Sequence, residues 1–132
     1  MLYAARSPAM KAPWLNLVVL RVADIERAAA FYRLLGLEFT KHAHGKGPEH
    51  YVYESAGFVF ELYPSSPEQP VSSSARIGFA VVDVDAAVST LGQIAGAKVV
   101  AAPKDSPWGR RAVVADPDNH RVELVAASGG SV

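Results

Sequence analysis

The chain has 132 residues, enough for one domain and too few for a sizeable second one. Half of the residues are hydrophobic and a fifth are charged, which supports a large core and argues against disorder. Lys and Arg together number 13, as do Asp and Glu, and the basic residues form no run, so we expect no nucleic-acid partner. The chain has no cysteine, which excludes disulfides, thiolate nucleophiles and cysteine metal sites.

The beginning of the chain shows no targeting pattern. Residues 1–11 have no apolar periodicity, and we expect them to form an irregular lead-in. The stretch Met1–Pro13 lacks the apolar core of a signal peptide, and no apolar run approaches the length of a membrane span. We therefore expect a cytoplasmic protein with no membrane partner.

The first half of the chain predicts a strand, a helix and three more strands. Residues 14–22 are apolar and β-branched, as in a buried strand. Asp24 is a candidate N-cap, apolar residues then recur at helical spacing, and Gly36 is a candidate helix stop. Further strands are expected over 37–42, 51–54 and 58–63, with a tight turn at Ala56-Gly57 joining the last two.

The second half repeats this order after a linker rich in Ser and Pro. A strand is expected over 76–84, followed by a helix with Asp85 as its N-cap and Gly96 as its stop. Three strands are then expected over 97–102, 110–115 and 121–126. Residues 116–119, Asp-Pro-Asp-Asn, predict the turn of the last hairpin, since Pro fixes φ and Asn tolerates a left-handed conformation.

Corresponding features of the two halves are separated by nearly constant intervals. The expected helix caps lie 61 positions apart, the helix-stop glycines 60, and the glutamates Glu61 and Glu123 lie 62 apart. A period of this length predicts two supersecondary units rather than a solenoid. We therefore predict a single α+β domain, 1–132, of two βαβββ modules, module one at about 14–64 and module two at about 76–127, with a linker over 64–75.

Four stretches in this order resemble the vicinal oxygen chelate superfamily of glyoxalases, bleomycin-resistance proteins and extradiol dioxygenases. They lie between about Leu15 and Val125: LVVLRVADIERAAAFYRLLGLEF resembles the family's opening, GFVFELYP its fourth strand, and PWGRRAVVADPDNHRVELV its closing hairpin. The resemblance implies that the two modules form a curved, mostly antiparallel sheet around a cup. In this family the cup holds a metal or a small organic ligand, within one chain or between the chains of a dimer.

The resemblance implies only half of the family's metal site. Metal-dependent members place ligands on the first and last strands of each module, and the last-strand positions match Glu61 and Glu123. The first-strand positions fall on Leu17 and Phe79, which cannot bind a metal. Two carboxylates alone are a poor site for a transition metal. We therefore predict no cofactor, with a divalent metal on Glu61 and Glu123 as the alternative.

We expect both glutamates to face the cup, where burial and the like-charged twin would raise the pKa of each carboxyl. A partner for Glu123 would be Arg110 if Ala115 faces His120 in the closing hairpin, or Arg111 if the register shifts by one residue. Such an arginine could be a ligand-binding clamp or one half of a structural Arg–Glu pair.

Histidines offer a second kind of partner. The two-residue turn predicts Val52 opposite Glu61 and His50 diagonal to it, so His50 is a candidate replacement ligand or general base. His42 and His44 fall in a polar loop, where His-X-His is more often solvated than metal-bound, and His120 follows a tight turn and is expected to be exposed.

The remaining candidates for the cup are apolar and aromatic. Leu17, Tyr63 and Phe79 are candidate ligand-binding residues, although aromatic stripes are more often plain core. Trp108 lies in a loop entering a strand, where it could stack on a flat ligand or pack locally.

Three functions remain open from the sequence. The first is a bleomycin-resistance-like protein that binds a small hydrophobic or aromatic molecule without a standard metal site. The second is a divalent-metal-dependent lyase, isomerase or dioxygenase that uses Glu61, Glu123 and His50. The third is an interaction domain whose cup is filled by its own side chains. The resemblance implies a homodimer in each case, since family members pair modules to close the cup.

Overall fold

The computed structural model describes residues 12–72 and 74–127. The lead-in expected over residues 1–11 lies outside this part of the chain. The described residues form two successive βαβββ units, as the sequence predicts. Their elements are β1 (Leu17–Val22), α1 (Ile25–Arg33), β2 (Thr40–His42), β3 (His50–Ser55), β4 (Phe58–Pro64), β5 (Arg76–Val81), α2 (Val84–Leu91), β6 (Lys98–Lys104), β7 (Arg111–Ala115) and β8 (Arg121–Ala126).

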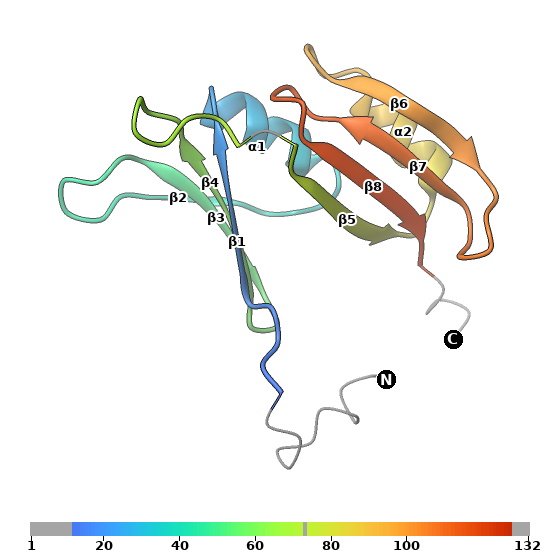
Figure 1. Ribbon diagram of the computed structural model, residues 1–132, viewed down its shortest axis with the longest axis horizontal. Helices are drawn as coiled ribbons and strands as arrows, with labels where there is room; N and C mark the ends of the chain where they lie inside the picture. The colour runs from blue at the N-terminus through green and yellow to red at the C-terminus, as the bar shows by residue number, and fades with distance from the viewer. Residues whose placement is uncertain (1–11, 73, 128–132) are drawn as a thin grey trace.

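Each unit forms a four-stranded mixed sheet. The strand order is β1-β4-β3-β2 in the first sheet and β5-β8-β7-β6 in the second. The first strand of each unit pairs in parallel with the last, and the other pairings are antiparallel. The α+β class with mostly antiparallel sheets is thus confirmed. In Figure 1 the sheets lie side by side with β1 and β5 as neighbouring edges, but no ladder joins the described strands of one sheet to the other, so the sheet is not closed.

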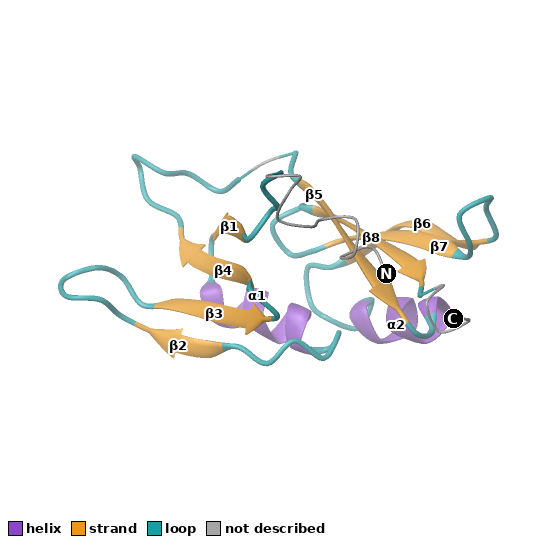
Figure 2. Ribbon diagram, turned by 90° about the horizontal axis from the view of Figure 1, so that it is seen from below, coloured by secondary structure: helices purple, strands orange, loops and turns teal. Residues whose placement is uncertain are grey.

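One helix covers one face of each sheet. Side chains alternate along a strand, so Leu20, Val22, Phe60 and Leu62 share the face of the first sheet that carries α1. Figure 2 shows both helices beside the strands they cover. The helices have 9 and 8 residues, and no helix in the described ranges is long and apolar enough to cross a membrane. The buried residues at the centre of the α1 layer are Ala28, Ala29, Phe31 and Tyr32.

The second helix begins two residues earlier than the sequence pattern predicts. Asp83, not Asp85, is the N-cap, and its carboxylate accepts a hydrogen bond from the Ala86 backbone N–H at 3.0 Å. This start places Val84, Val88 and Leu91 on one face, where all three are buried. The buried apolar face therefore determines which aspartate is the N-cap, because only a helix that starts after Asp83 includes Val84 in that face.

The two units also contact each other through side chains. Phe79 of β5 lies 6.2 Å from Tyr32 and from Phe60, measured between ring centroids. The Asp118 carboxylate in the β7–β8 turn accepts a hydrogen bond from the Ala23 backbone N–H, just before α1. The turn of the second unit is thus fixed against the helix of the first.

Candidate functional site

The candidate site lies on the faces of the two sheets that turn away from their helices, called here the open faces. By strand alternation, Glu61 lies on the open face of the first sheet and Glu123 on that of the second. The open face of the first sheet also carries Leu17, Val19, Thr40, His42, His50, Val52 and Tyr63. That of the second also carries Arg76, Gly78, Ala80, Arg111, Val113 and Val125.

A pocket of about 330 Å³ opens on the second sheet. Gly78 and Ala80 of β5 and Val125 of β8 form its apolar floor, and Gly78 pairs directly with Glu123. A Cβ at Gly78 would stand 3.8–3.9 Å from atoms of Glu123, in ordinary van der Waals contact. The small residues of β5 therefore leave room above the sheet, while Trp108 and Arg111 form the rim.

Glu123 is an ionised carboxylate held by two arginines. The Arg111 Nε donates to Glu123 Oε2 at 2.6 Å, and the Arg76 guanidinium donates to Oε1 at 3.3 Å. The hydrogen bond from Arg111, followed by the charges of both arginines, lowers the pKa of Glu123 against the opposing effect of burial. The expectation of a raised pKa is wrong for Glu123, because its neighbours are cations and Glu61 is not among the groups that shift it.

The partner of Glu123 is Arg111 and not Arg110. In the β7–β8 hairpin Ala115 faces Arg121 instead of His120, which puts Val113 opposite Glu123 and Arg111 diagonal to it. The expected register is wrong by one residue, and a shift of one residue exchanges the faces of a strand. Arg110 binds Asp85 and Asp105 at 3.0 Å each and does not line the pocket.

Leu17 and Phe79 are not equivalent positions. Leu17 is on the open face of β1 and 48% exposed, whereas Phe79 points to the helix side of β5, among the rings of the other unit. The wrong equivalence follows from giving the first strands the 62-residue interval that separates Glu61 from Glu123. Aligning the true caps, Asp24 and Asp83, matches Leu17 with Arg76, and the residue beside Glu123 is Gly78.

Glu61 and His50 lie on the open face in the predicted arrangement. The Ala56-Gly57 turn sets Val52 opposite Glu61, as predicted, and places His50 opposite Tyr63. The His50 and Tyr63 rings stack with centroids 4.1 Å apart, and the Tyr63 hydroxyl lies 3.2 Å from His50 Nε2. Burial, and next the charge of Glu61, raise the pKa of Tyr63. His50 thus contacts Tyr63, and the charge of Glu61 acts on Tyr63.

Trp108 is a large exposed apolar side chain at the pocket rim. It lies in the loop between β6 and β7 and is 76% exposed. The Ser106 hydroxyl accepts a hydrogen bond from the Trp108 backbone N–H at 3.2 Å, and φ of Gly109 is +113°, which only glycine adopts readily. The loop therefore fixes the backbone at Trp108 and leaves its indole ring open to solvent.

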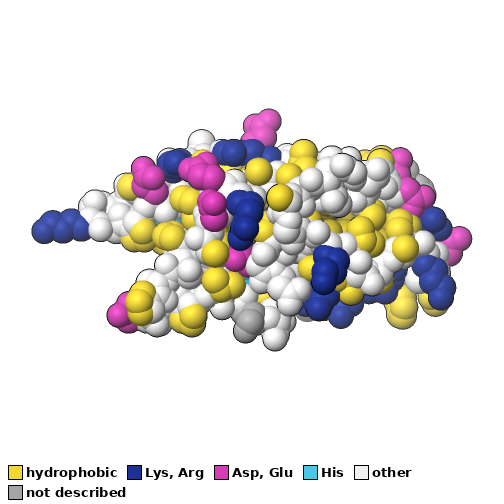
Figure 3. All heavy atoms as spheres, turned by 90° about the horizontal axis from the view of Figure 1, so that it is seen from above, with side chains coloured by type: hydrophobic (Ala, Val, Ile, Leu, Met, Phe, Trp, Pro, Cys, Tyr) yellow, Lys and Arg dark blue, Asp and Glu magenta, His cyan; other side chains and the backbone are white. Residues whose placement is uncertain are grey.

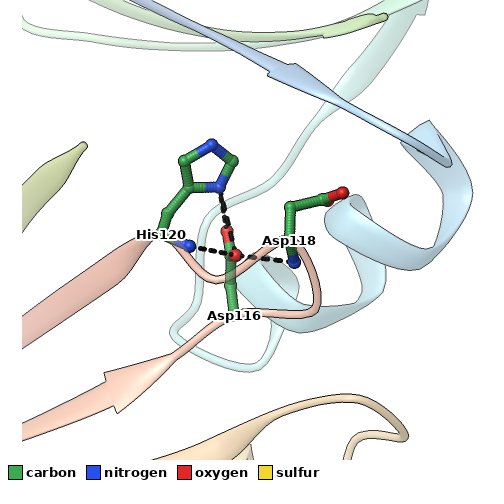
Figure 4. A group of neighbouring side chains, drawn as sticks. All are labelled: Asp116, Asp118 and His120. Carbon is green, nitrogen blue, oxygen red and sulfur yellow. Dashed lines mark hydrogen bonds and ion pairs between the residues drawn. The ribbon is translucent and has the colours of Figure 1, made fainter. Parts of the chain in front are cut away.

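A group that the sequence did not predict surrounds Asp116 in the β7–β8 turn (Figure 4). Asp116 and His120 are 1% and 0% exposed, so the expected exposure of His120 is wrong. Asp116 Oδ1 accepts the backbone N–H groups of Asp118 and His120, both at 2.9 Å. Asp116 Oδ2 accepts the Tyr32 hydroxyl at 2.6 Å and faces His120 Nδ1 at 2.8 Å.

The pKa values of this group reflect a buried charge pair. Burial lowers the pKa of His120, but its hydrogen bond to Asp116 and the charges of Asp116 and Asp118 outweigh that effect and raise it. Burial, followed by the charge of Asp116, raises the pKa of Tyr32 well above its usual value, so Tyr32 stays a neutral donor. The sequence Asp-Pro-Asp-Asn-His could have indicated this group, because the side chain of its first Asp can accept hydrogen bonds from the backbone N–H groups two and four residues later.

The residues present do not form the family's four-ligand metal site. On the first strands, Val19 pairs with Glu61 and Gly78 pairs with Glu123, and neither offers a ligand atom; Glu123 is also bound by two guanidinium groups. In the described ranges, ligand atoms of Asp116, Asp118 and His120 lie within 4.8 Å of one another. The four donors around Asp116 already use its oxygens, which favours a structural role for that carboxylate over a metal ligand.

A second, larger pocket of about 660 Å³ lies between the two units. It is lined on one side by Val18, Tyr53 and Phe60 and on the other by Ile77 and Phe79. These five residues lie on the helix side of the sheets, and Arg76, Gly78 and Ala80 of β5 line the pocket as well. Gly78 and Ala80 therefore border both pockets.

Comparison with solved structures finds the same architecture in other proteins. An antibiotic binding protein from Streptomyces sp. CB03234, TnmS3, is 28% identical with a TM-score of 0.69, over 89% of this chain and 98% of the other. A glyoxalase/bleomycin resistance protein from the same organism is 29% identical with a TM-score of 0.63, over 85% and 99%. A glyoxalase-related enzyme from Fulvimarina pelagi is 22% identical with a TM-score of 0.68, over 86% and 87%, a likeness of fold alone.

Comparison of the sequence with protein families gives one match. No curated protein matches the chain. The sequence profile of the Glyoxalase/Bleomycin resistance protein/Dioxygenase superfamily matches residues 14–124, which is most of the chain. The two βαβββ units and the placement of their strands agree with that match, and the chain therefore belongs to the glyoxalase/bleomycin resistance protein/dioxygenase superfamily.

Proposed function

We propose that this protein binds a small hydrophobic or aromatic molecule on the open face of the second sheet, without a standard metal site. The observation that carries the proposal is the pocket of about 330 Å³ with an apolar floor, the exposed Trp108 at its rim and the Arg111–Glu123 pair beside it. Binding sites typically combine apolar surface with a few polar groups that fix orientation. The relative described as an antibiotic binding protein, 28% identical, supports this class of function.

Trp108 and Arg111 have separate roles in this proposal. An exposed indole beside an apolar floor offers a flat surface on which an aromatic ring can stack. Arg111 uses Nε and one terminal nitrogen toward Glu123, and a guanidinium has further N–H donors in the same plane. A ligand would stack on Trp108 and place an acceptor group at the remaining donors of Arg111.

The test uses tryptophan fluorescence, since the chain has only two tryptophans. In a Trp14→Phe variant Trp108 is the only reporter, and it is titrated with bleomycin and with 1-anilinonaphthalene-8-sulfonate. We expect saturable quenching, and a dissociation constant at least about tenfold weaker in Arg111→Ala. Calorimetry with Trp108→Ala should show a similar loss. Binding that survives both substitutions would place the ligand elsewhere and contradict the proposal.

We also propose that the protein is a homodimer. The edges of β1 and β5 are unpaired in the described chain, and the exposed apolar residues Trp14, Leu15, Leu17 and Val19 lie along β1 and the segment before it. A second copy that covers this strip would remove apolar surface from water and protect a sheet edge. Light scattering should give twice the chain mass of 14.0 kDa, and a mass of 14.0 kDa at micromolar concentration would refute the dimer.

The competing function is a divalent-metal enzyme that uses Glu61, His50 and Glu123. His50 favours it, because its Nδ1 faces the Pro48 carbonyl at 3.1 Å, which puts the lone pair on Nε2, where the Tyr63 hydroxyl at 3.2 Å is its present partner. The two arginines on Glu123 count against it, since a metal would have to displace them. Elemental analysis distinguishes the two functions: a stoichiometric metal lost in both Glu61→Ala and Glu123→Ala would support the enzyme.

A further inference from the structure

Three histidine rings gather at the outer edge of the first sheet. His42 ends β2, His44 follows in the β2–β3 loop, and His50 begins β3. His42 pairs with His50 across the two strands, so their side chains lie on the same open face. The ring centroids lie 5.3 Å apart for His44 and His50, 5.9 Å for His42 and His44, and 6.1 Å for His42 and His50. We call these three residues the histidine cluster.

The spacing of the cluster is close to that of imidazoles around one metal ion. An imidazole nitrogen binds zinc at about 2.0–2.1 Å, which puts two ring centres of a tetrahedral site about 5 Å apart. The observed separations are slightly larger. The ring nitrogens of the three histidines do not all lie within 4.8 Å of one another, so metal binding requires the exposed side chains of His42 and His44 to rotate toward His50.

His50 is oriented as metal-binding histidines usually are. It is 1% exposed, and the Pro48 carbonyl, which can only accept, fixes the proton on Nδ1. Metal ligands typically donate their second ring N–H to a carbonyl in this way, which sets the tautomer and presents the other nitrogen. Here the other nitrogen, Nε2, meets the hydroxyl of Tyr63 at 3.2 Å.

The remaining two rings have no competing partner in the described chain. Within residues 12–72 and 74–127, the His42 and His44 rings make stacking contacts but no hydrogen bond or ion pair that would occupy their nitrogens. The cation next to His42 in the sequence, Lys41, is directed elsewhere, since its ammonium binds Glu26 at 2.6 Å on the helix side of the sheet.

We propose that His42, His44 and His50 form a binding site for one divalent late transition metal, with Zn²⁺, Ni²⁺ and Cu²⁺ as the fitting ions. Neutral imidazoles suit these metals, whereas Mg²⁺ and Ca²⁺ prefer oxygen ligands. In the metal-bound form His50 Nε2 exchanges the Tyr63 hydroxyl for the metal, and water completes the coordination shell. The site shares no residue with the pocket at Trp108, so it stands or falls independently of the proposed binding function. It shares His50 with the competing metal enzyme but uses His42 and His44 in place of Glu61 and Glu123.

The direct test is calorimetric titration of the tag-free protein with ZnCl₂ near pH 7.5. We expect about one zinc per chain, and an affinity at least about tenfold weaker in His42→Ala and in His44→Ala. Both side chains are exposed, so these variants should fold. Lys46→Ala, an exposed change in the same loop, is the matched control and should bind as the wild type does. The absence of zinc binding by the wild type, or unchanged binding by the His42→Ala/His44→Ala double variant, would overturn the proposal.

Two further measurements separate the cluster from other zinc ligands. Tyr63→Phe removes the hydroxyl that occupies His50 Nε2, and it should bind zinc at least as tightly as the wild type. Loss of binding in this variant would make the phenol a ligand and refute a site of three imidazoles. In long-range ¹H–¹⁵N spectra zinc should shift the Nε2 resonance of His50 and leave His120 unchanged. A shift at His120 alone would assign the metal to the β7–β8 turn and overturn the proposal.

Discussion

The Asp116 carboxylate connects the two units, with one oxygen bound to its own turn and the other to the first unit. Its Oδ1 accepts two backbone N–H groups of its own turn, and its Oδ2 accepts the hydroxyl of Tyr32 from α1. A buried carboxylate is costly unless its oxygens are hydrogen-bonded, so each donor contributes more than an exposed one would. The turn therefore depends on a side chain of the other unit.

Tyr32→Phe should lower the free energy of unfolding by about 1–3 kcal/mol, because it leaves a buried charged acceptor without one of its donors. Urea denaturation measures the change. Tyr53→Phe is the matched control, since the Tyr53 hydroxyl has no hydrogen bond within the described residues, and its effect should be clearly smaller. Equal effects of the two substitutions would show that the Tyr32–Asp116 bond adds nothing.

His120 predicts a dependence of stability on pH. Its pKa is higher in the folded protein than the ordinary histidine value of about 6.5, so protonated His120 stabilises the fold fully below about that pH. The contribution is lost as the pH rises through the folded-state pKa. The stability difference between the wild type and His120→Gln should therefore shrink from acid toward alkaline pH. Urea denaturation at several pH values measures it, and a difference that grows with pH would contradict the raised pKa.

At the scale of elements, hairpin registers show what the sequence could predict. The β3–β4 register was predicted correctly because a two-residue turn leaves one pairing, with Val52 opposite Glu61. The β7–β8 register was missed by one residue. There the Asp116 backbone N–H donates to the His120 carbonyl at 3.0 Å and closes the turn. The Asp116 carboxylate accepts the backbone N–H groups of Asp118 and His120, a contact that the strand pattern does not predict. The choice of Arg110 over Arg111 followed from that miss.

The start of α2 gives a test at this scale. Asp83→Ala should lower the free energy of unfolding by about 1 kcal/mol, because the Ala86 N–H loses its capping acceptor. Asp85→Ala, in the first turn of the same helix, removes an exposed ion pair with Arg110 and should have a smaller effect. Thermal denaturation of the two variants compares the sites directly. A larger loss in Asp85→Ala would restore the helix start that the sequence pattern suggested.

At the scale of the whole molecule, the sequence predicted two repeated units and their family, since strand and helix periods and turn residues are local properties. The site depended on which face each residue takes and on contacts between the units, and neither is local. Phe79 was matched with Leu17 because their separation equals that of Glu61 and Glu123, but the side chain of Phe79 packs against Tyr32 and Phe60 on the helix side. The surface agrees with the charge balance: acidic and basic side chains are interspersed with apolar ones in Figure 3.

The contacts between the units predict that they unfold together. The Tyr32–Asp116 and Ala23–Asp118 bonds and the rings around Phe79 all join one unit to the other. Trp14 precedes β1 in the first unit and Trp108 precedes β7 in the second. Trp108→Phe therefore leaves Trp14 to report on the first unit, and Trp14→Phe leaves Trp108 to report on the second. The two fluorescence midpoints in urea should coincide with each other and with the loss of circular dichroism. Separate midpoints would mean that the units fold independently.

The buried turn also bears on the chemical durability of the chain. Asp116 precedes Pro117, and Asp–Pro peptide bonds are readily hydrolysed in acid because the aspartic carboxyl attacks its own backbone carbonyl. In the folded protein both carboxylate oxygens are held by hydrogen bonds, and the residue is 1% exposed. The fold thereby holds both carboxylate oxygens on other donors. Cleavage at this position reports unfolding, since only a chain that has released Asp116 can be cut between its two final strands.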